Sequence, residues 1–231
     1  MSTHGHSTRD RIVDALMDIA AERDWDRIEI TDIAERAGVS LLEFREAFPS
    51  KGAVLGSFNR RIDQKVLSDD DQSLAEESTR DRIFDVLMRR FDALAHYKHA
   101  LKRMAPALAR DPLTLAGLNQ AALNSMRFML ATAGVDTEGP MGALKLQGAV
   151  LVYAKVMDVW FRDEDPGLSR TMAALDEELK RGGMVIKRLE DLERMTAPLS
   201  GALHRMMERG MAMAKKERGA HRADADLDPS I

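Results

Sequence analysis

The segment 30–55, ITDIAERAGVSLLEFREAFPSKGAVL, carries charged side chains whose chemistry suits contact with phosphate. Arg45 lies in the short stretch SLLEFREAF and Lys51 follows six residues later, and both side chains can pair with phosphate oxygens. Glu43 and Glu46 lie in the same stretch and repel phosphate. Two interpretations therefore stay open: a surface that reads DNA, or a scaffold of the same kind that has lost its DNA contacts.

Histidine is the other candidate for chemistry. His96 and His99 stand three residues apart on a predicted helix, a spacing at which two imidazoles can bind one metal ion. No further His, Cys or carboxylate cluster joins them nearby in the sequence, so we expect solvent-exposed histidines and no metal site. The chain also has no G-x-S-x-G, no Walker A motif and no glycine-rich turn after a strand. We therefore expect neither an enzyme nor a bound cofactor.

Composition favours an all-α protein. The 231 residues are 45% hydrophobic and 31% charged, with only 7 prolines and few β-branched runs. The absence of cysteine excludes disulfides and fits a reducing compartment. No apolar run reaches the ~18–20 residues that span a membrane, and the N-terminus lacks the apolar stretch of a signal peptide. We expect a cytoplasmic protein without stable membrane insertion.

Net charge gives no support to nucleic-acid binding. The whole chain carries a formal charge of −4, whereas nucleic-acid-binding domains are often basic. Residues 1–67 hold 10 Lys and Arg against 12 Asp and Glu. Any contact with DNA therefore needs a basic face that is concentrated locally.

Two helices are predicted before the turn at Gly38. An apolar stripe at helical spacing predicts the first over about 8–24, with Thr8 as its N-cap. The stripe consists of Ile12, Val13, Leu16, Ile19 and Ala20. Thr31 is expected to cap the second helix, and Gly38 to follow its end in the left-handed conformation. Trp25 is expected to fill the corner between the two.

A third and a fourth helix are predicted after that turn. Ser40 and Glu43 have the spacing of a capping box, which opens the third helix, and Pro49 ends it. The fourth helix is predicted over about 51–67. On the third helix, Leu41 can touch a thymine methyl group. Glu43 can accept a hydrogen bond from a cytosine amine, or its carboxylate can be used by the capping box.

The chain is expected to contain two helical domains. Residues 1–67 form the first, with a helix-turn-helix motif at about 30–49. The segment 68–78, SDDDQSLAEES, is acidic and nearly free of apolar residues, which is typical of a solvated loop. Longer amphipathic helices over 79–215 form the second domain. The polar tail 216–231 is predicted to be disordered.

The most apolar predicted helix, residues 141–161, is a candidate wall for a ligand pocket. Apolar side chains cover much of its circumference, which indicates a central buried helix, and plain core packing explains the same pattern. Tyr153 and Trp160 each carry a polar group that needs a partner when buried, so they are best suited to orient an apolar ligand. The candidate pocket residues are Val150, Tyr153, Met157, Trp160 and Phe161.

The last predicted helical region, about 185–215, is rich in methionine on one side and basic on the other. Methionine suits adaptable surfaces, and the basic face suits anionic lipid headgroups. A dimer interface and a lipid-touching helix both fit this pattern, and the dimer interface is favoured. The candidate interface residues are Leu199, Leu203, Met206 and Met207.

Residues 9–67 resemble the TetR family of transcriptional repressors. The resemblance rests on the opening helix RIVDALMDIAAERDWDRIEIT, the segment IAERAGVS, a short helix ending in Phe, and PSK before a fourth helix that starts with small residues. It implies an all-α protein with an N-terminal three-helix helix-turn-helix domain and a C-terminal helical domain for ligand binding and dimerisation. The positions that most often meet the DNA backbone in this family match Thr31, Ser40, Arg45 and Lys51 here.

The recognition helix departs from the family pattern. Members commonly have Gly-Thr-hydrophobic-Tyr where this chain has LEFR, residues 42–45. The usual tyrosine contacts phosphate, and Arg45 can make the same contact. The DNA-binding residues implied are Thr31, Ser40, Leu41, Leu42, Glu43, Arg45 and Lys51. The resemblance also implies a homodimer that binds double-stranded operator DNA, acts most simply as a repressor, and responds to a small apolar ligand.

Residues 126–184 are similar to the lipid-binding accessory proteins of ubiquinone biosynthesis, which share the TetR fold and do not act as repressors. The similarity rests on an apolar helix, the Asp-rich turn RDEDPG and the amphipathic segment ALDEELKR. An accessory protein that binds isoprenoid-like lipid is therefore the alternative function. The preserved segments IAERAGVS and FPSK favour the regulator, because the lipid-binding relatives usually have a degraded motif.

Overall fold

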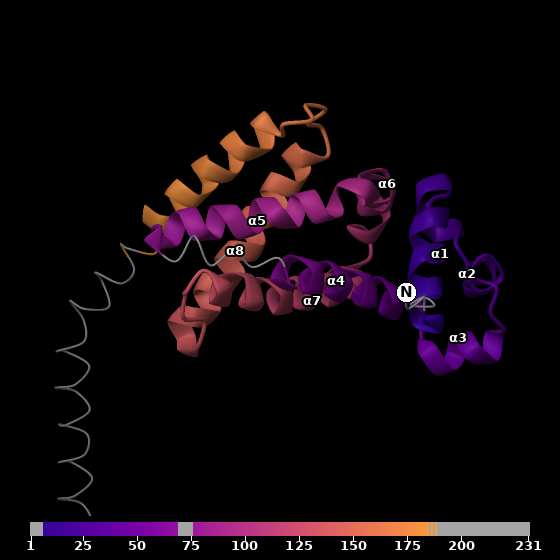
Figure 1. The fold of residues 1–231 in the computed structure, drawn as a ribbon. Coiled ribbons are helices and arrows are strands. Elements are labelled where there is room, and N and C mark those ends of the chain that lie inside the picture. The colour runs from indigo at the N-terminus through magenta and orange to yellow at the C-terminus, as the bar shows by residue number, and fades with distance from the viewer. Residues whose placement is uncertain (1–6, 69–75, 185, 187, 189–231) are drawn as a thin grey trace, which may run out of the picture. The chain divides into compact units, whose positions relative to one another are not determined.

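The structure is a computed structural model, and it describes residues 7–68, 76–184, 186 and 188. By its internal contacts the chain divides into two units, Met1–Gly182 and Gly183–Ile231, and the helices named below belong to the first. Every regular element in the described ranges is helical, which confirms the all-α prediction (Figure 1). The predicted dimer-interface residues and the tail 216–231 lie outside the described residues, as does most of the acidic segment 68–78.

The helices follow the predicted order. The first group comprises α1 (Thr8–Glu22), the 3-10 turn η1 (Trp25–Arg27), α2 (Ile30–Ala37), α3 (Leu41–Ala47) and α4 (Lys51–Ser68). The second comprises α5 (Thr79–Leu94), η3 (Ala95–Tyr97), α6 (Lys98–Leu108), α7 (Pro112–Thr132) and α8 (Gly139–Trp160). Residues 169–184 are also helical. Hydrophobic periodicity therefore locates the helices to within a few residues.

The N-cap of α1 lies one residue before the predicted one. The Ser7 hydroxyl accepts from the Asp10 backbone N–H at 3.2 Å, and the Asp10 carboxylate accepts from the Ser7 N–H at 3.3 Å. Ser7 is therefore the N-cap, and the prediction of Thr8 is wrong because this reciprocal box satisfies the free N–H groups better. The predicted apolar stripe of α1 is buried, and Trp25 is buried at the corner that follows.

The N-cap of α2 is also displaced from its prediction. The helix starts at Ile30 with Glu29 as its N-cap, and the Asp32 carboxylate accepts from the Glu29 N–H at 2.9 Å. Thr31 lies inside the first turn, so its prediction as the cap is wrong. Gly38 ends the helix with a φ of 61°, which confirms the left-handed residue expected there.

The helices of both groups share one continuous core. α1 packs against α2 and α6, while α4 packs against α5 and α7, and α7 packs against α8 (Figure 1). The first turn of α8 lies against the loop before it, because a Cβ at Gly142 would come within 2.1 Å of the Thr137 carbonyl carbon. These contacts place α4 in both groups, since it follows α3 directly and then runs along α7.

A buried polar cluster joins α4, α5 and α7. Arg90 on α5 pairs with the Asp63 carboxylate on α4, and its guanidinium also donates to the Asn59 side-chain carbonyl at 2.7 Å. The Ser125 hydroxyl on α7 donates to Asp63 at 2.6 Å and accepts from the Asn59 amide at 2.7 Å. Burial of a charge is tolerated only with such partners, so the cluster fixes how these helices meet.

Candidate functional site

The third helix turns a mixed apolar and charged face outward. Leu41 and Leu42 are 54% and 69% exposed, and Arg45 is exposed on the same short helix. Phe44 and Phe48 are buried, with ring centroids 6.4 Å apart, and they hold α3 against the core. The structure therefore assigns the two phenylalanines to the core and both leucines to the surface.

The carboxylate of Glu43 is used by the capping box. It accepts from the Ser40 backbone N–H at 2.7 Å and from the Ser40 hydroxyl at 2.8 Å, and the hydroxyl accepts from the Glu43 N–H at 3.2 Å. The backbone hydrogen bond from Ser40 lowers the pKa of Glu43 from its ordinary value. Of the two roles that the sequence left open for Glu43, the geometry therefore favours the helix cap over a base contact.

Lys51 holds together the corner between η1 and α4. Its ammonium donates to the backbone carbonyls of Trp25 at 2.7 Å and Ile28 at 2.9 Å, and it lies 4.2 Å from the centroid of the Trp25 ring. Partial burial lowers the pKa of Lys51. An ammonium group has three donors, so one remains for a partner such as phosphate. The sequence could not show this use of Lys51, because Trp25 is 26 positions away.

Two arginines of α1 cap the helices that form the motif. Arg9 donates to the Ala47 carbonyl at the end of α3 at 2.5 Å and lies 4.2 Å from the Phe48 ring centroid. Arg11 donates to the carbonyls of Ala37 and Gly38 at 3.2 and 3.3 Å, at the end of α2. Cations at helix C-termini satisfy free carbonyls and oppose the helix dipole. No local pattern in the sequence identifies these partners, because they lie on other helices.

Arg45 stays available for a binding partner, because it takes no part in the ion pairs around the motif. Arg36 pairs with Glu22 at 2.8 Å, and Arg23 pairs with Asp32 at 3.0 Å, so these two acids near the motif are offset by their own partners, whereas Glu46 is exposed beside Arg45. Arg45 forms no ion pair or hydrogen bond with another described side chain. Thr31 and Ser40 are exposed near the starts of α2 and α3, where free backbone N–H groups favour an anion. The face around α3 can therefore attract phosphate despite the acidic composition of residues 1–67.

The pocket residues predicted on α8 form part of an aromatic cluster. The Phe91 ring on α5 stacks on Tyr153 with centroids 5.1 Å apart and lies 5.6 Å from Trp160. Burial raises the pKa of Tyr153. The Arg90 guanidinium lies 5.5 Å from the Tyr153 ring centroid and interacts with the Tyr153 hydroxyl. Among the described residues, the buried Trp160 indole N–H has no hydrogen-bond partner. A buried donor without an acceptor is unusual in native structures, so the Trp160 indole N–H is the distinctive polar group of this cluster.

The other predicted positions are distributed around this cluster. Val150 is buried, Met157 and Phe161 are partly buried, and the Phe161 ring lies 5.4 Å from Trp160. Leu199, Leu203, Met206 and Met207 lie outside the described residues.

The two histidines are exposed, as expected from the sequence. Across the described ranges no group of His, Cys, Asp and Glu side chains is arranged to hold a metal ion. In the same ranges no helix combines the length and the apolar character needed to cross a membrane.

Comparison with solved structures identifies the architecture. No family model and no curated protein sequence matches the chain. A TetR transcriptional regulator from Nitrosomonas europaea aligns with a TM-score of 0.62 and 22% identity, over 76% of this chain and 98% of that one. A TetR regulator from a Rhodococcus strain aligns with a TM-score of 0.55 and 18% identity, over 76% of this chain and 95% of that one. None of these descriptions mentions a lipid-binding accessory protein, so that resemblance is not confirmed. The chain has the fold of the TetR transcriptional regulators.

Proposed function

We propose that the protein is a TetR-type regulator that binds operator DNA through α3. The observation that carries the proposal is the exposed face of α3, where Arg45 has no partner among the described side chains and two leucines face solvent. Both adjoining helix ends are tied to α1 by arginine, so this face is presented on a rigid support. A short helix held in this way can enter the major groove, with Arg45 on a phosphate and Leu41 against a thymine methyl group.

We propose that the regulator acts as a homodimer. On α8, Leu144 and Leu151 are 44% and 58% exposed and stand seven positions apart, so they lie on one side of the helix. Exposed apolar side chains of this kind favour burial against a second copy. A symmetric dimer reads two half-sites about one helical turn of DNA apart.

We propose that an apolar effector with an acceptor oxygen binds beside α8 and changes DNA affinity. Trp160 supplies a buried indole N–H, Tyr153 supplies a buried hydroxyl beside Arg90, and Phe91 supplies an aromatic wall. An effector alters DNA binding only as far as it prefers one arrangement of the helices over another. Release from DNA on effector binding, the behaviour of a repressor, is the simplest such response.

The test is fluorescence anisotropy of the full chain with a labelled fragment of its own upstream region, against a scrambled fragment, at several salt concentrations. We expect specific binding with a steep dependence on salt, and a uniform loss of affinity in Arg45→Ala. Arg27→Ala is the matched control, because Arg27 is an exposed cation outside the motif. Arg45→Ala binding both fragments like the unchanged protein would overturn the proposed docking.

Failure to bind either fragment at low salt would favour the alternative function. In that case native mass spectrometry of the purified protein should detect a bound apolar lipid. Substituting Trp160 with Phe should then weaken lipid retention, since the substitution removes the buried indole N–H.

A further inference from the structure

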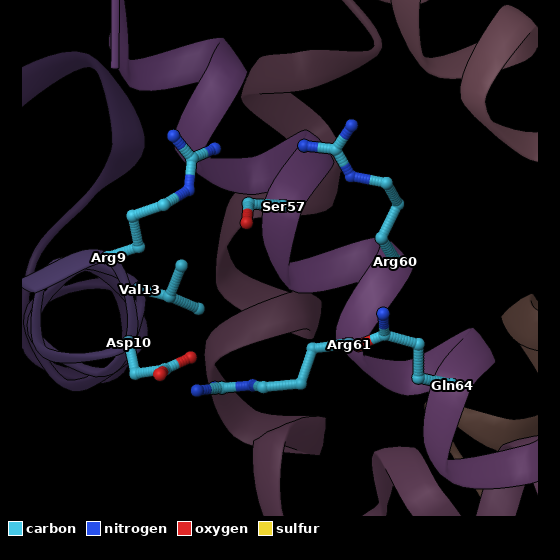
Figure 2. A pocket seen from close by; sticks show the side chains of 7 residues that line it. All are labelled: Arg9, Asp10, Val13, Ser57, Arg60, Arg61 and Gln64. Carbon is cyan, nitrogen blue, oxygen red and sulfur yellow. The ribbon is translucent and has the colours of Figure 1, made fainter. Parts of the chain in front are cut away.

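A basic hollow of about 220 Å³ lies between α1 and α4, apart from both the exposed face of α3 and the aromatic cluster on α8. Its lining consists of Arg9, Asp10, Val13, Ser57, Arg60, Arg61 and Gln64. Figure 2 shows the guanidinium groups of Arg9 and Arg60 turned toward the same side of the hollow, with Ser57 between them. Three cations from two helices therefore face one space that is lined by a single carboxylate.

Two of these cations are held in place by other contacts. Arg9 is fixed by the Ala47 carbonyl and the Phe48 ring. Arg61 donates to Asp14 at 2.6 Å and to the Tyr97 hydroxyl at 3.4 Å. The Asp10 carboxylate accepts hydrogen bonds from Ser7 at the start of α1. Because neighbouring groups already position these cations, their side chains would lose less conformational entropy when a ligand binds.

Arg60 differs from the other two arginines. It is exposed and makes no ion pair or hydrogen bond with another described side chain, so its donors are available. Guanidinium groups form bidentate hydrogen bonds with phosphate, and a serine hydroxyl and a glutamine amide add further donors. A phosphate monoester carries a charge of about −1.5 to −2 near pH 7. Because Arg61 is paired with Asp14, Arg9 and Arg60 are the cations whose charge would attract it.

We propose that this hollow binds the phosphate group of a small organic phosphate and thereby bridges α1 and α4. Arg60 and Arg9 hold the phosphate oxygens, and Ser57 donates a hydrogen bond. Arg60 lies nine residues along α4 from Lys51, about 13 Å by helical rise, which separates the hollow from the start of α4 beside α3. The proposal stands apart from the proposed DNA-binding function, because phosphate binding can be measured without DNA.

The test is isothermal titration calorimetry of the full chain with phenyl phosphate and with inorganic phosphate, at constant ionic strength. We expect saturable binding of both probes, and affinity about tenfold or more weaker in Arg60→Gln, which removes the charge-assisted hydrogen bonds. Arg60→Lys keeps the charge and loses the bidentate geometry, so its affinity should lie between that of the unchanged protein and that of Arg60→Gln. Lys65→Gln is the control, since Lys65 is exposed on the same helix and does not line the hollow.

Each other outcome would overturn the proposal. Equal weakening by Arg60→Gln and Lys65→Gln would mean that only general charge attracts the probes. Binding that Arg60→Gln leaves unchanged would place the phosphate elsewhere. No binding of either probe, together with a smaller salt dependence of DNA binding in Arg60→Gln, would assign the hollow to the DNA backbone instead.

Discussion

The α3 surface and the polar cluster around Asp63 both contain an arginine, but the arginine of the cluster is paired and buried whereas that of α3 is exposed. In the cluster, Arg90 is buried and its hydrogen-bond partners Asp63 and Asn59 both lie on the neighbouring α4. On α3, Arg45 faces solvent without a partner among the described side chains. A buried charge is costly unless it is paired, whereas an exposed charge contributes little to folding and stays available for a binding partner. Substitutions should therefore separate into effects on stability and effects on binding.

Arg90→Met should have the largest effect, because it leaves the Asp63 charge buried without its counter-ion. We expect the free energy of unfolding to fall by about 3–5 kcal/mol. Urea denaturation followed by circular dichroism measures this. The double variant Arg90→Met/Asp63→Leu should recover part of the loss, since it removes the unpaired charge. A loss below about 1 kcal/mol in Arg90→Met would show that water reaches the cluster.

Lys51→Met tests a partly buried residue, which is intermediate between the buried Arg90 and the exposed Arg45. The substitution removes a charged donor from the carbonyls of Trp25 and Ile28. We expect the free energy of unfolding to fall by about 2 kcal/mol, since hydrogen bonds to charged groups contribute about 1.5–3 kcal/mol. DNA affinity should be compared at a temperature at which the variant is fully folded. Unchanged stability combined with weaker DNA binding would make Lys51 mainly a phosphate contact.

Arg45→Ala should affect DNA binding and leave the fold intact. We expect weaker binding to all sequences, a salt slope reduced by about 1, and a stability change within about 0.5 kcal/mol. Anisotropy titrations and urea denaturation of the same preparation measure the two quantities. If stability falls and DNA binding does not, the comparison between exposed and buried arginine fails at this position.

Glu43→Gln should have the smallest effect, and the effect should depend on pH. The Ser40 N–H depresses the pKa of Glu43 in the folded state, so its contribution to stability is present above the unfolded pKa of about 4.3 and is lost as pH falls through the folded pKa. Glutamine also fits a capping box, so the variant should match the unchanged protein more closely at low pH than at pH 7. Urea midpoints between pH 3 and pH 7 test this, and parallel curves would contradict it.

Local signals in the sequence predict much of the fold. Periodicity identified the helices, Gly38 marked a turn, and the Ser40 and Glu43 capping box was confirmed. The wrong N-caps of α1 and α2 show the limit of such signals. Thr8 and Thr31 are plausible caps by residue type, but Ser7 and Glu29 occupy those positions because each is followed three residues later by an aspartate that completes the cap.

The contacts that support the candidate site could not be predicted from local patterns. Arg9 reaches Ala47 across 38 positions, and Asn59 reaches Ser125 across 66. Such partners are set by how the helices pack, and one sequence contains no periodic signal for them. The hollow between α1 and α4 has no local signal either, because Arg9 is about 50 positions away from Arg60 and Arg61 in the chain.

The arginine caps supplied by α1 have a consequence for hydrogen exchange. Helices of eight and seven residues such as α2 and α3 are too short to be stable alone, so they depend on α1 for their carbonyl partners and their apolar support. Amide protons of α2 and α3 should therefore exchange no more slowly than those of α1, because the three helices should open together as one cooperative unit. In that case α3 would stay folded only while α1 is folded.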